Sequence, residues 1–458
     1  HCNYGVHMDI LIEEIAIYGA TFLVCTAIVV IYFKRLKRDS LEVAKKVVVA
    51  KEEGRFEPVS LHPHIDLTKC IGSGACISAC PEKDILGIVD GVATVVNASS
   101  CIGHGACFHS CPVEAISLRI GTETRGVELP HVKPNYETNI SGIYISGELG
   151  GMGLIKNSTE QGIQAVESII KSGKYSSVDD QVLDVVIIGA GPAGIAAALN
   201  SKKHGIRFEI LEQEALGGAL FTFPRSKVVM SKPMELPFLG MVKLYHTSKE
   251  ELLGLWTKVL GENNITVSEH SKAENIIPLE AGGFKVRVSG ANPREVLARN
   301  VIIAIGRRGS PRKLGVPGEG LQNVAYRLLE PENISGKKIF IVGGGDSAVE
   351  AALLLMNHND VILSYRKDMF VRIKIDNRTE ILKAIEKAKL RMIFSSNVKE
   401  IKSNEVTLSI NSTEGEEQLE TCPNDLVYIF AGGELPSKFL KKAGVSVEKK
   451  FGKIIKQH

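Results

Sequence analysis

The sequence predicts an α/β chain that contains two three-layer domains, a small α+β domain ahead of them and one apolar N-terminal helix. Three observations predict this architecture. Two glycine-rich turns each follow an apolar run of strand character, six cysteines fall within 42 residues in two identically spaced groups, and the run Ile15 to Phe33 has no charged residue. At 458 residues the chain is long enough for several domains.

The composition is that of an ordinary globular protein. Hydrophobic residues make up 44% and charged residues 23%, and the formal net charge of +3 is close to neutral for this length. No basic groove interleaved with aromatic residues is present, so nucleic acid is not an expected partner.

The uncharged run Ile15 to Phe33 comprises 19 residues, which as a helix reach roughly the 30 Å of a bilayer core. Acidic residues precede the run and basic residues follow it: Asp9, Glu13 and Glu14, then Lys34, Arg35, Lys37 and Arg38. Basic residues stay cytoplasmic, so we expect a single-pass helix over 15–33 in the cytoplasmic membrane, residues 1–14 outside and the remaining domains inside. A buried core helix is the alternative, and 34–60 is predicted to be a juxtamembrane linker.

Two cysteine motifs repeat with the same internal spacing. Each motif ends in Cys-Pro, and their cysteines are Cys70, Cys76 and Cys80, then Cys101, Cys107 and Cys111. The pattern resembles that of two-cluster bacterial ferredoxins, in which the fourth cysteine of each motif ligates the other cluster. The resemblance implies a ferredoxin-like domain over 61–120 with two iron–sulfur clusters.

One departure from that pattern affects the ligands. Ser73 and His104 replace the second cysteine of the two motifs. By the crossed rule, Cys70, Cys76 and Cys111 hold one cluster with Ser73 as candidate fourth ligand, and Cys101, Cys107 and Cys80 hold the other with His104. Serine oxygen and imidazole nitrogen both bind iron, so 4Fe-4S clusters and three-cysteine 3Fe-4S clusters both stay open. Zinc is the competing metal, but the closing Cys-Pro and the crossed repeat disfavour it.

The first glycine-rich turn has all the parts of a Rossmann-like dinucleotide site. An apolar run enters Gly189, Gly191 and Gly194, an alanine-rich helix follows, and a second strand ends at Glu212, 18 residues past Gly194. The glycines let a pyrophosphate approach the backbone, the helix N-terminus stabilises its charge, and the acid binds ribose hydroxyls. We expect a FAD-binding domain over 181–315.

The second Rossmann-like turn differs in the residue that follows its second strand. Gly343, Gly345 and Ala348 form the turn, and Arg366 stands where the first unit has its acid, with Lys367 and Arg372 nearby. An arginine holds a 2′-phosphate that a carboxylate would repel, so we expect NADPH over 316–425. Solvated arginines are the alternative, and NADH remains open as the nucleotide.

The arrangement of these two units resembles the low-molecular-weight thioredoxin reductases, but in a circularly permuted order. The family's C-terminal FAD segment, T-x-x-x-G-x-[YF]-x-x-G-[DE], appears here ahead of the first glycine turn, as Thr138, Gly142, Tyr144, Gly147 and Glu148. The resemblance implies that 121–180 is a permuted FAD segment with a helix over Thr159 to Ile170 and a linker over 172–181. It also implies a return to the FAD domain over 426–458, roles for Gly217 and Gly218 at the flavin, and a homodimer.

One family feature is missing, and its absence shapes the functional expectation. The family carries C-x-x-C before its NADPH turn, whereas no C-x-x-C occurs in this sequence. We therefore expect an oxidoreductase in which flavin links two-electron NADPH to one-electron clusters and an external electron-carrier protein. No protein acid or base is required, and the resemblance implies a domain hinge near 312–318 and 424–426. A membrane electron-entry enzyme that reduces quinone or cytochrome, and a redox sensor without turnover, are the alternatives.

Overall fold

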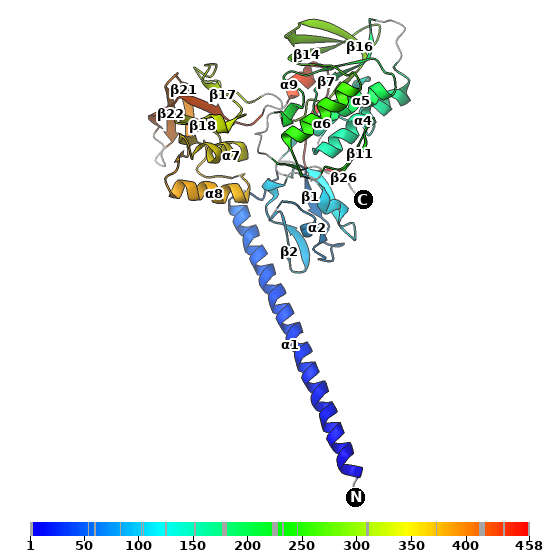
Figure 1. Cartoon of the computed structure of the whole chain (residues 1–458), viewed down its shortest axis with the longest axis vertical. Helices are drawn as coiled ribbons and strands as arrows, with labels where there is room; N and C mark the ends of the chain where they lie inside the picture. The colour runs from blue at the N-terminus through cyan, green and yellow to red at the C-terminus, as the bar shows by residue number, and fades with distance from the viewer. Residues whose placement is uncertain are drawn as a thin grey trace. The chain divides into compact units, whose positions relative to one another are not determined.

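The computed structural model describes residues 3–53, 55–58, 61–82, 84–101, 103, 105–123, 126–150, 153–175, 181–221, 228–230, 233–244, 246–307, 311–371, 373–411, 417–433 and 436–456. The chain divides into two compact units, one built mainly from residues 1–118 and the other mainly from residues 119–455. Figure 1 labels many of the helices and strands of both units.

The first unit begins with one uninterrupted helix, α1, over Asn3–Glu52 (Figure 1). Its stretch from Ile17 onward is the one described helix that is long and apolar enough to cross a membrane, and none of its apolar window is buried. Residues 34–52 of the predicted juxtamembrane segment 34–60 continue this helix. Lysine, arginine, leucine and alanine dominate that stretch, and these are good helix formers.

The second half of α1 packs on the small cysteine-rich domain of the same unit. Ser40 Oγ accepts a hydrogen bond of 3.0 Å from the backbone amide of Asp90, and Lys46 Nζ lies 2.7 Å from Asp84. Val43 lies so close to Gly87 that a Cβ there would be 2.5 Å from Val43 Cγ1. The helix is therefore attached firmly to this domain.

The cysteine-rich domain is built from short elements. β1 pairs with β4, and β2 and β3 form an antiparallel hairpin. The elements are β1 (Leu61–Ile65), α2 (Ala75–Ser78), β2 (Leu86–Val89), β3 (Val92–Val95), the 3-10 turn η1 (Ala98–Ser100), α3 (Ala106–His109) and β4 (Ile116–Ile120). Ile85 and Leu118 are almost fully buried in this domain.

The second unit contains a seven-stranded sheet around the first glycine-rich turn. The strand order is β13, β8, β7, β16, β15, β14, and β6 pairs with the later half of β16. The strands are β6 (Ile143–Ile145), β7 (Leu183–Ile188), β8 (Phe208–Leu211), β13 (Val267–Ser268), β14 (Ser271–Pro278), β15 (Phe284–Gly290) and β16 (Arg294–Ile303). One apolar core joins this sheet to helices α4 (Ile155–Ser172), α5 (Pro192–Lys203) and α6 (Lys249–Glu262).

The segment ahead of the first glycine turn is thus part of the same sheet domain. β6 lies parallel to β16, with Ile143 opposite Val301, and α4 lies against α5. The predicted helix over 159–170 is longer in the structure, because α4 begins at Ile155 and ends at Ser172. Gly173, with φ of 66°, ends it in the left-handed conformation that glycine adopts readily.

The second glycine-rich turn belongs to a five-stranded parallel sheet. Its strand order is β17, β24, β18, β19, β20, with helices covering one face and a three-stranded antiparallel sheet covering the other. The elements are β17 (Val324–Ala325), β18 (Lys338–Val342), α7 (Asp346–Leu355), β19 (Asp360–Ser364), α8 (Ile375–Glu386), β20 (Arg391–Ile393), β21 (Ser396–Ile401), β22 (Glu405–Asn411), β23 (Glu417–Pro423) and β24 (Leu426–Ile429).

The chain returns to the first sheet domain later than residue 426. β24 hydrogen-bonds to β18 and so completes the five-stranded sheet. Only after it does α9 (Ser437–Lys442) bury Leu440 in the core of the seven-stranded sheet, and β25 (Val447–Lys450) pair with β5 (Val127–Pro130). The remaining elements are η2 (Glu148–Gly150), η3 (Gly218–Leu220), β9 (Val228–Met230), β10 (Met234–Leu236), β11 (Gly240–Val242), β12 (His246–Ser248), η4 (Pro331–Asn333) and β26 (Lys453–Lys456).

The contact between α4 and α5 yields a stability prediction. A Cβ on Gly162 would lie 2.1 Å from the carbonyl oxygen of Ala193, whereas a Cβ on Gly254 of α6 would meet nothing within 4 Å. Gly162→Ala should therefore lower the free energy of unfolding by about 1–3 kcal/mol through overpacking. Gly254→Ala, the matched control within a helix, should raise it by about 0.5–1 kcal/mol. Denaturant unfolding measures both, and equal effects of the two substitutions would contradict the packing argument.

Candidate functional site

Two groups of three cysteines come together in the first unit. Burial raises the pKa of Cys76, and the nearby Cys70 and Cys111 raise that pKa further. Burial also raises the pKa of Cys107 to about 12, with added contributions from Cys101 and Cys80. Charge interactions of this kind require short distances. Cys76 therefore lies near Cys70 and Cys111, and Cys107 lies near Cys101, Cys80 and, with a smaller contribution, Cys76. This grouping is compatible with the crossed sets, which stay a prediction.

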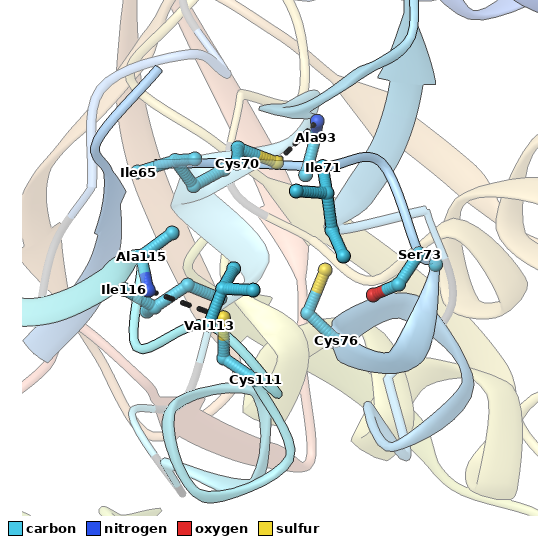
Figure 2. Close-up of a pocket in the computed structure, with 11 residues that line it drawn as sticks. Ile65, Cys70, Ile71, Ser73, Cys76, Ala93, Cys111, Val113, Ala115 and Ile116 are labelled. Atoms are coloured by element: carbon cyan, nitrogen blue, oxygen red, sulfur yellow. Dashed lines mark hydrogen bonds between the residues drawn. The ribbon is translucent and has the colours of Figure 1, made fainter. Parts of the chain in front are cut away.

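The first crossed set surrounds a pocket with an apolar lining (Figure 2). Cys70, Cys76, Cys111 and the exposed Ser73 all line it, and Ile71 lies beside Cys70. The remaining lining residues are Ile65, Gly74, Ala93, Val113, Ala115 and Ile116. Three thiols and one hydroxyl around an apolar pocket form a donor set that suits an iron–sulfur cluster.

Glycines allow the cysteine loops to fold so tightly. Gly72 has φ of 66°, and a Cβ on it would lie 2.0 Å from the carbonyl oxygen of Gly91, so no other residue fits against the β2–β3 turn. Backbone amides also point at the thiols: Ala93 N lies 3.3 Å from Cys70 Sγ, and Ala115 N lies 3.2 Å from Cys111 Sγ. Hydrogen bonds to sulfur tune the reduction potential of a bound cluster.

Across the described residues, no group of three His, Cys, Asp or Glu side chains is arranged to hold one metal ion. Tetrahedral zinc requires its thiolates within about 2.3 Å of the metal, whereas a cluster separates them. His104, the candidate fourth ligand of the second set, lies outside the described residues.

The first glycine-rich turn joins β7 to α5 and leaves room for a phosphate group. Gly189 has φ of 106°, and a Cβ on Gly194 would lie 1.8 Å from the carbonyl oxygen of Gly189. Gly191, the N-cap of α5, faces open space, and Gly218 approaches it so closely that a Cβ there would be 3.4 Å from Gly191 Cα. Glycine backbone and a helix N-terminus therefore form a cradle that fits a pyrophosphate, with Gly217 immediately beside it.

Glu212 lies at the end of β8, as the motif predicts, and is 5% exposed. Its Oε2 accepts a 2.8 Å hydrogen bond from Ala190 N, and its Oε1 accepts a 3.0 Å bond from Glu214 N. Burial raises the pKa of Glu212, which these two amides partly counteract. The carboxylate is thus held rigidly beside the glycine turn, with lone pairs left to accept ribose hydroxyls.

The segment that precedes this turn in sequence also reaches it. A Cβ on Gly147 would lie 3.2 Å from Ala193 Cβ, and Gln161 Oε1 accepts a 2.8 Å hydrogen bond from Gly147 N. Glu148 is exposed, and its charge partly counteracts the lowering that burial imposes on the pKa of Arg307. The structure therefore places Gly147 and Glu148 next to the first turn.

The second glycine-rich turn joins β18 to α7. Gly343 has φ of 146°, and a Cβ on it would lie 2.6 Å from the carbonyl oxygen of Phe430. Gly345 is the N-cap of α7 and faces open space, while Ala348 is fully buried against the sheet. Arg366 follows β19 and is exposed, so it can contact a bound nucleotide. Arg372 lies outside the described residues.

Sequence reasoning missed three contacts around these turns. Gln161 and Arg307 stand outside every motif, and no spacing rule identifies them. Arg327 forms a two-pronged ion pair with Glu214, in which Nη2 lies 2.7 Å from Oε1 and Nη1 contacts Oε2. This pair joins the start of the second nucleotide domain to the loop after Glu212. Only the position of Glu214, two residues past Glu212, could have suggested the pair.

Comparison with known proteins agrees with this geometry. Residues 186–456 match the pyridine nucleotide-disulphide oxidoreductase family model, and residues 62–112 match a 4Fe-4S dicluster domain model. A ferredoxin–NADP reductase of Ignicoccus hospitalis is 29% identical over 275 residues, 58% of this chain and 83% of that protein. A thioredoxin reductase of Bacillus subtilis is 28% identical over 290 residues, 60% of this chain and 81% of that protein.

A solved structure shows the same likeness. The bacillithiol disulfide reductase of Bacillus cereus superposes with a TM-score of 0.51 at 25% identity, covering 60% of this chain and 86% of that protein. The family model spans more than half of the present sequence. The chain therefore belongs to the pyridine nucleotide-disulphide oxidoreductase family, and it is an oxidoreductase of the flavin-dependent type that also carries a 4Fe-4S domain.

Proposed function

We propose that this protein transfers electrons between NADPH and an external electron-carrier protein, through FAD and two iron–sulfur clusters on the same polypeptide. Several relatives are named as ferredoxin–NADP reductases, which supports a carrier protein as the partner. The main support for this proposal is that two nucleotide cradles and two groups of cysteines occur in one chain.

The cysteine inventory supports clusters, rather than a dithiol, as the route for electrons. The sequence contains no C-x-x-C. Cys422 is fully buried, and burial raises its pKa to about 11, so it stays a thiol at neutral pH. The sequence therefore lacks the C-x-x-C dithiol through which thioredoxin reductases pass electrons to a disulfide.

Each nucleotide site has a distinct set of residues. Gly189, Gly191 and Gly194 cradle the FAD pyrophosphate, Glu212 holds its ribose, and Gly147, Glu148, Gly217 and Gly218 complete that site. Gly343, Gly345 and Ala348 receive the NADPH pyrophosphate, and Arg366 and Arg372 bind its 2′-phosphate. Bound flavin supplies the exchange between hydride and single electrons.

The ligand sets of the clusters are also proposals. Cys70, Cys76 and Cys111 hold one cluster, with Ser73 as its fourth ligand, because Ser73 lines the same pocket as the three thiols. Cys80, Cys101 and Cys107 hold the other cluster, with His104 as its fourth ligand.

The N-terminal helix anchors the protein to the cytoplasmic membrane. Its side chains from Ile17 to Phe33 are exposed, including Phe22, Leu23 and Ile31 at more than 60%. So much contiguous apolar surface is costly in water and favourable in lipid. Basic residues after Phe33 orient the chain with its domains in the cytoplasm. Retention of the full chain in membranes at alkaline pH tests the anchor. Release of the protein into the supernatant would contradict the proposed anchor.

Anaerobic mixing with NADPH tests the proposed electron path. Flavin absorbance should bleach first, and cluster EPR signals should then change, faster with NADPH than with NADH. Bleaching without any change in the clusters would favour flow from clusters to NADP⁺ but would not prove it, because low cluster potentials alone block the forward step. No bleaching with either nucleotide would contradict the enzyme reading and favour a sensor.

Arg366→Ala should raise the KM for NADPH by roughly tenfold or more, because a charge-assisted bond to phosphate contributes about 1.5–3 kcal/mol. The KM for NADH should change by about twofold at most, since NADH lacks the phosphate. Lys389→Ala removes the same charge from an exposed position in the same domain and serves as the control. An equal loss for both nucleotides would refute the assigned role of Arg366.

Ser73→Ala should convert the first cluster to a three-cysteine site that loses one iron on oxidation, which EPR and iron analysis detect. Ser73→Cys should retain four irons and shift the reduction potential of that cluster. Ser78→Ala is the matched control, because Ser78 lies in the next turn and its hydroxyl bonds to Gly74 O. Unchanged iron content and EPR in Ser73→Ala would rule out serine ligation.

A further inference from the structure

We propose that the cluster held by Cys70, Cys76 and Cys111 is the one next to the membrane surface. It exchanges single electrons, at the exposed loop Leu67–Ile71, with a redox protein held in the same membrane. The inference rests on the proposed anchoring of α1 and adds the order of the clusters, the site of exchange and the kind of partner. One electron moves in each event and no bond changes: the reduced cluster is oxidised as the partner's centre is reduced.

The order of the clusters follows from contacts between α1 and the cysteine-rich domain. Ser40, nearest to the apolar run, bonds to Asp90 in the β2–β3 turn. Lys46 contacts Asp84, four residues after Cys80. At the far end, Arg55 N bonds to Ala50 O, and Arg55 O accepts a 2.9 Å bond from Ser99 N.

The β2–β3 turn that binds Ser40 also supports the Cys70 loop. Gly72 lies against the carbonyl of Gly91, and Ala93 N donates to Cys70 Sγ. The Ser99 segment leads directly into Cys101, whose amide bonds to Ala98 O. Cys70 therefore lies near the membrane end of the packed stretch of α1, and Cys101 lies near its far end.

Helix geometry sets the scale of this separation. Seven residues separate Phe33 from Ser40, which corresponds to about 10 Å of helix, and ten more separate Ser40 from Ala50, or about 15 Å. The hydrogen bonds and the ion pair along α1 keep the domain from turning about it. The Cys70 loop is thus held within about 10 Å of the end of the apolar run along the helix axis.

The loop beside Cys70 carries two exposed apolar side chains. Leu67 and Ile71, which flank Cys70, are 63% and 65% exposed, whereas Cys76 of the same set is 6% exposed. Exposed apolar side chains beside a cluster suit a protein partner, because apolar contacts exclude water from the path between two redox centres. A loop held at a fixed height suits a partner held at the same surface, whereas a quinone stays within the hydrocarbon core.

Relaxation of the cluster EPR signals tests the order. The full chain is reconstituted into vesicles whose lipid headgroups carry chelated dysprosium, which speeds relaxation of nearby spins with a steep dependence on distance. The two signals are assigned with Ser73→Cys, which changes only the first cluster. The first cluster should relax several-fold faster than the second, and equal or reversed relaxation would overturn the inference.

Two insertion variants distinguish failure of this inference from failure of the proposed membrane anchor. A flexible Gly-Ser insertion between Arg38 and Asp39 should abolish the difference while both clusters are retained, because it uncouples the domain from α1. A helical insertion of seven alanine-rich residues at the same place moves both clusters about 10 Å farther from the membrane. It should weaken the acceleration of relaxation for both clusters. Protein that does not remain on the vesicles, with neither signal affected, would refute the anchor and this inference with it.

The exchange site is tested with Leu67→Asp and with Leu419→Asp, a control at a 66% exposed leucine in the second unit. The probe is a small haem protein tethered to lipid headgroups, reduced by NADPH through the reconstituted enzyme. Leu67→Asp should slow its reduction several-fold and leave the reduction of ferricyanide unchanged, whereas Leu419→Asp should affect neither. An unaffected haem protein would exclude the loop as the exchange site. If a quinone dissolved in the bilayer were reduced faster than the haem protein, the partner would be a quinone and not a protein.

Discussion

The close approach of Gly162 to the carbonyl of Ala193 constrains how two helices of the first nucleotide domain pack. It lets α4, which precedes the first glycine-rich turn in sequence, lie directly on α5, which follows that turn. The same approach positions Gln161 to bind Gly147 N and brings Gly147 within contact of α5. The segment before the first glycine-rich turn and the helix after it therefore meet beside the proposed FAD site.

A second constraint acts at Glu212. Glu212 is buried, yet two backbone amides hold its carboxylate, and the Arg327 pair fixes the following loop through Glu214. Removing one partner of such a buried group costs more than the net contribution of a single hydrogen bond. The geometry of the turn and that of the loop after it are therefore coupled.

Much of this architecture could be predicted because the motifs fix both backbone and chemistry. The glycine turns predicted β7–α5 and β18–α7, since each turn requires its glycines for a local steric reason. The repeated cysteines predicted that Cys70, Cys76 and Cys111 lie around one pocket. The sequence could not reveal that α1 continues to Glu52, because charged residues after an apolar run are equally compatible with a linker. Arg307 and Arg327 also escaped prediction, since their partners are distant in sequence and depend on the folded domain.

The continuity of α1 with the cysteine-rich domain has a mechanical consequence. A membrane helix tilts to match its apolar length to the thickness of the surrounding bilayer. α1 is one uninterrupted helix that contacts the domain at Ser40, at Lys46 and around Ala50. Because the helix and the domain are coupled there, a tilt of the helix also moves the domain. In a membrane-anchored molecule of this design, lipid composition would adjust the height of the clusters above the headgroups, and so the tunnelling distance to a neighbouring redox centre.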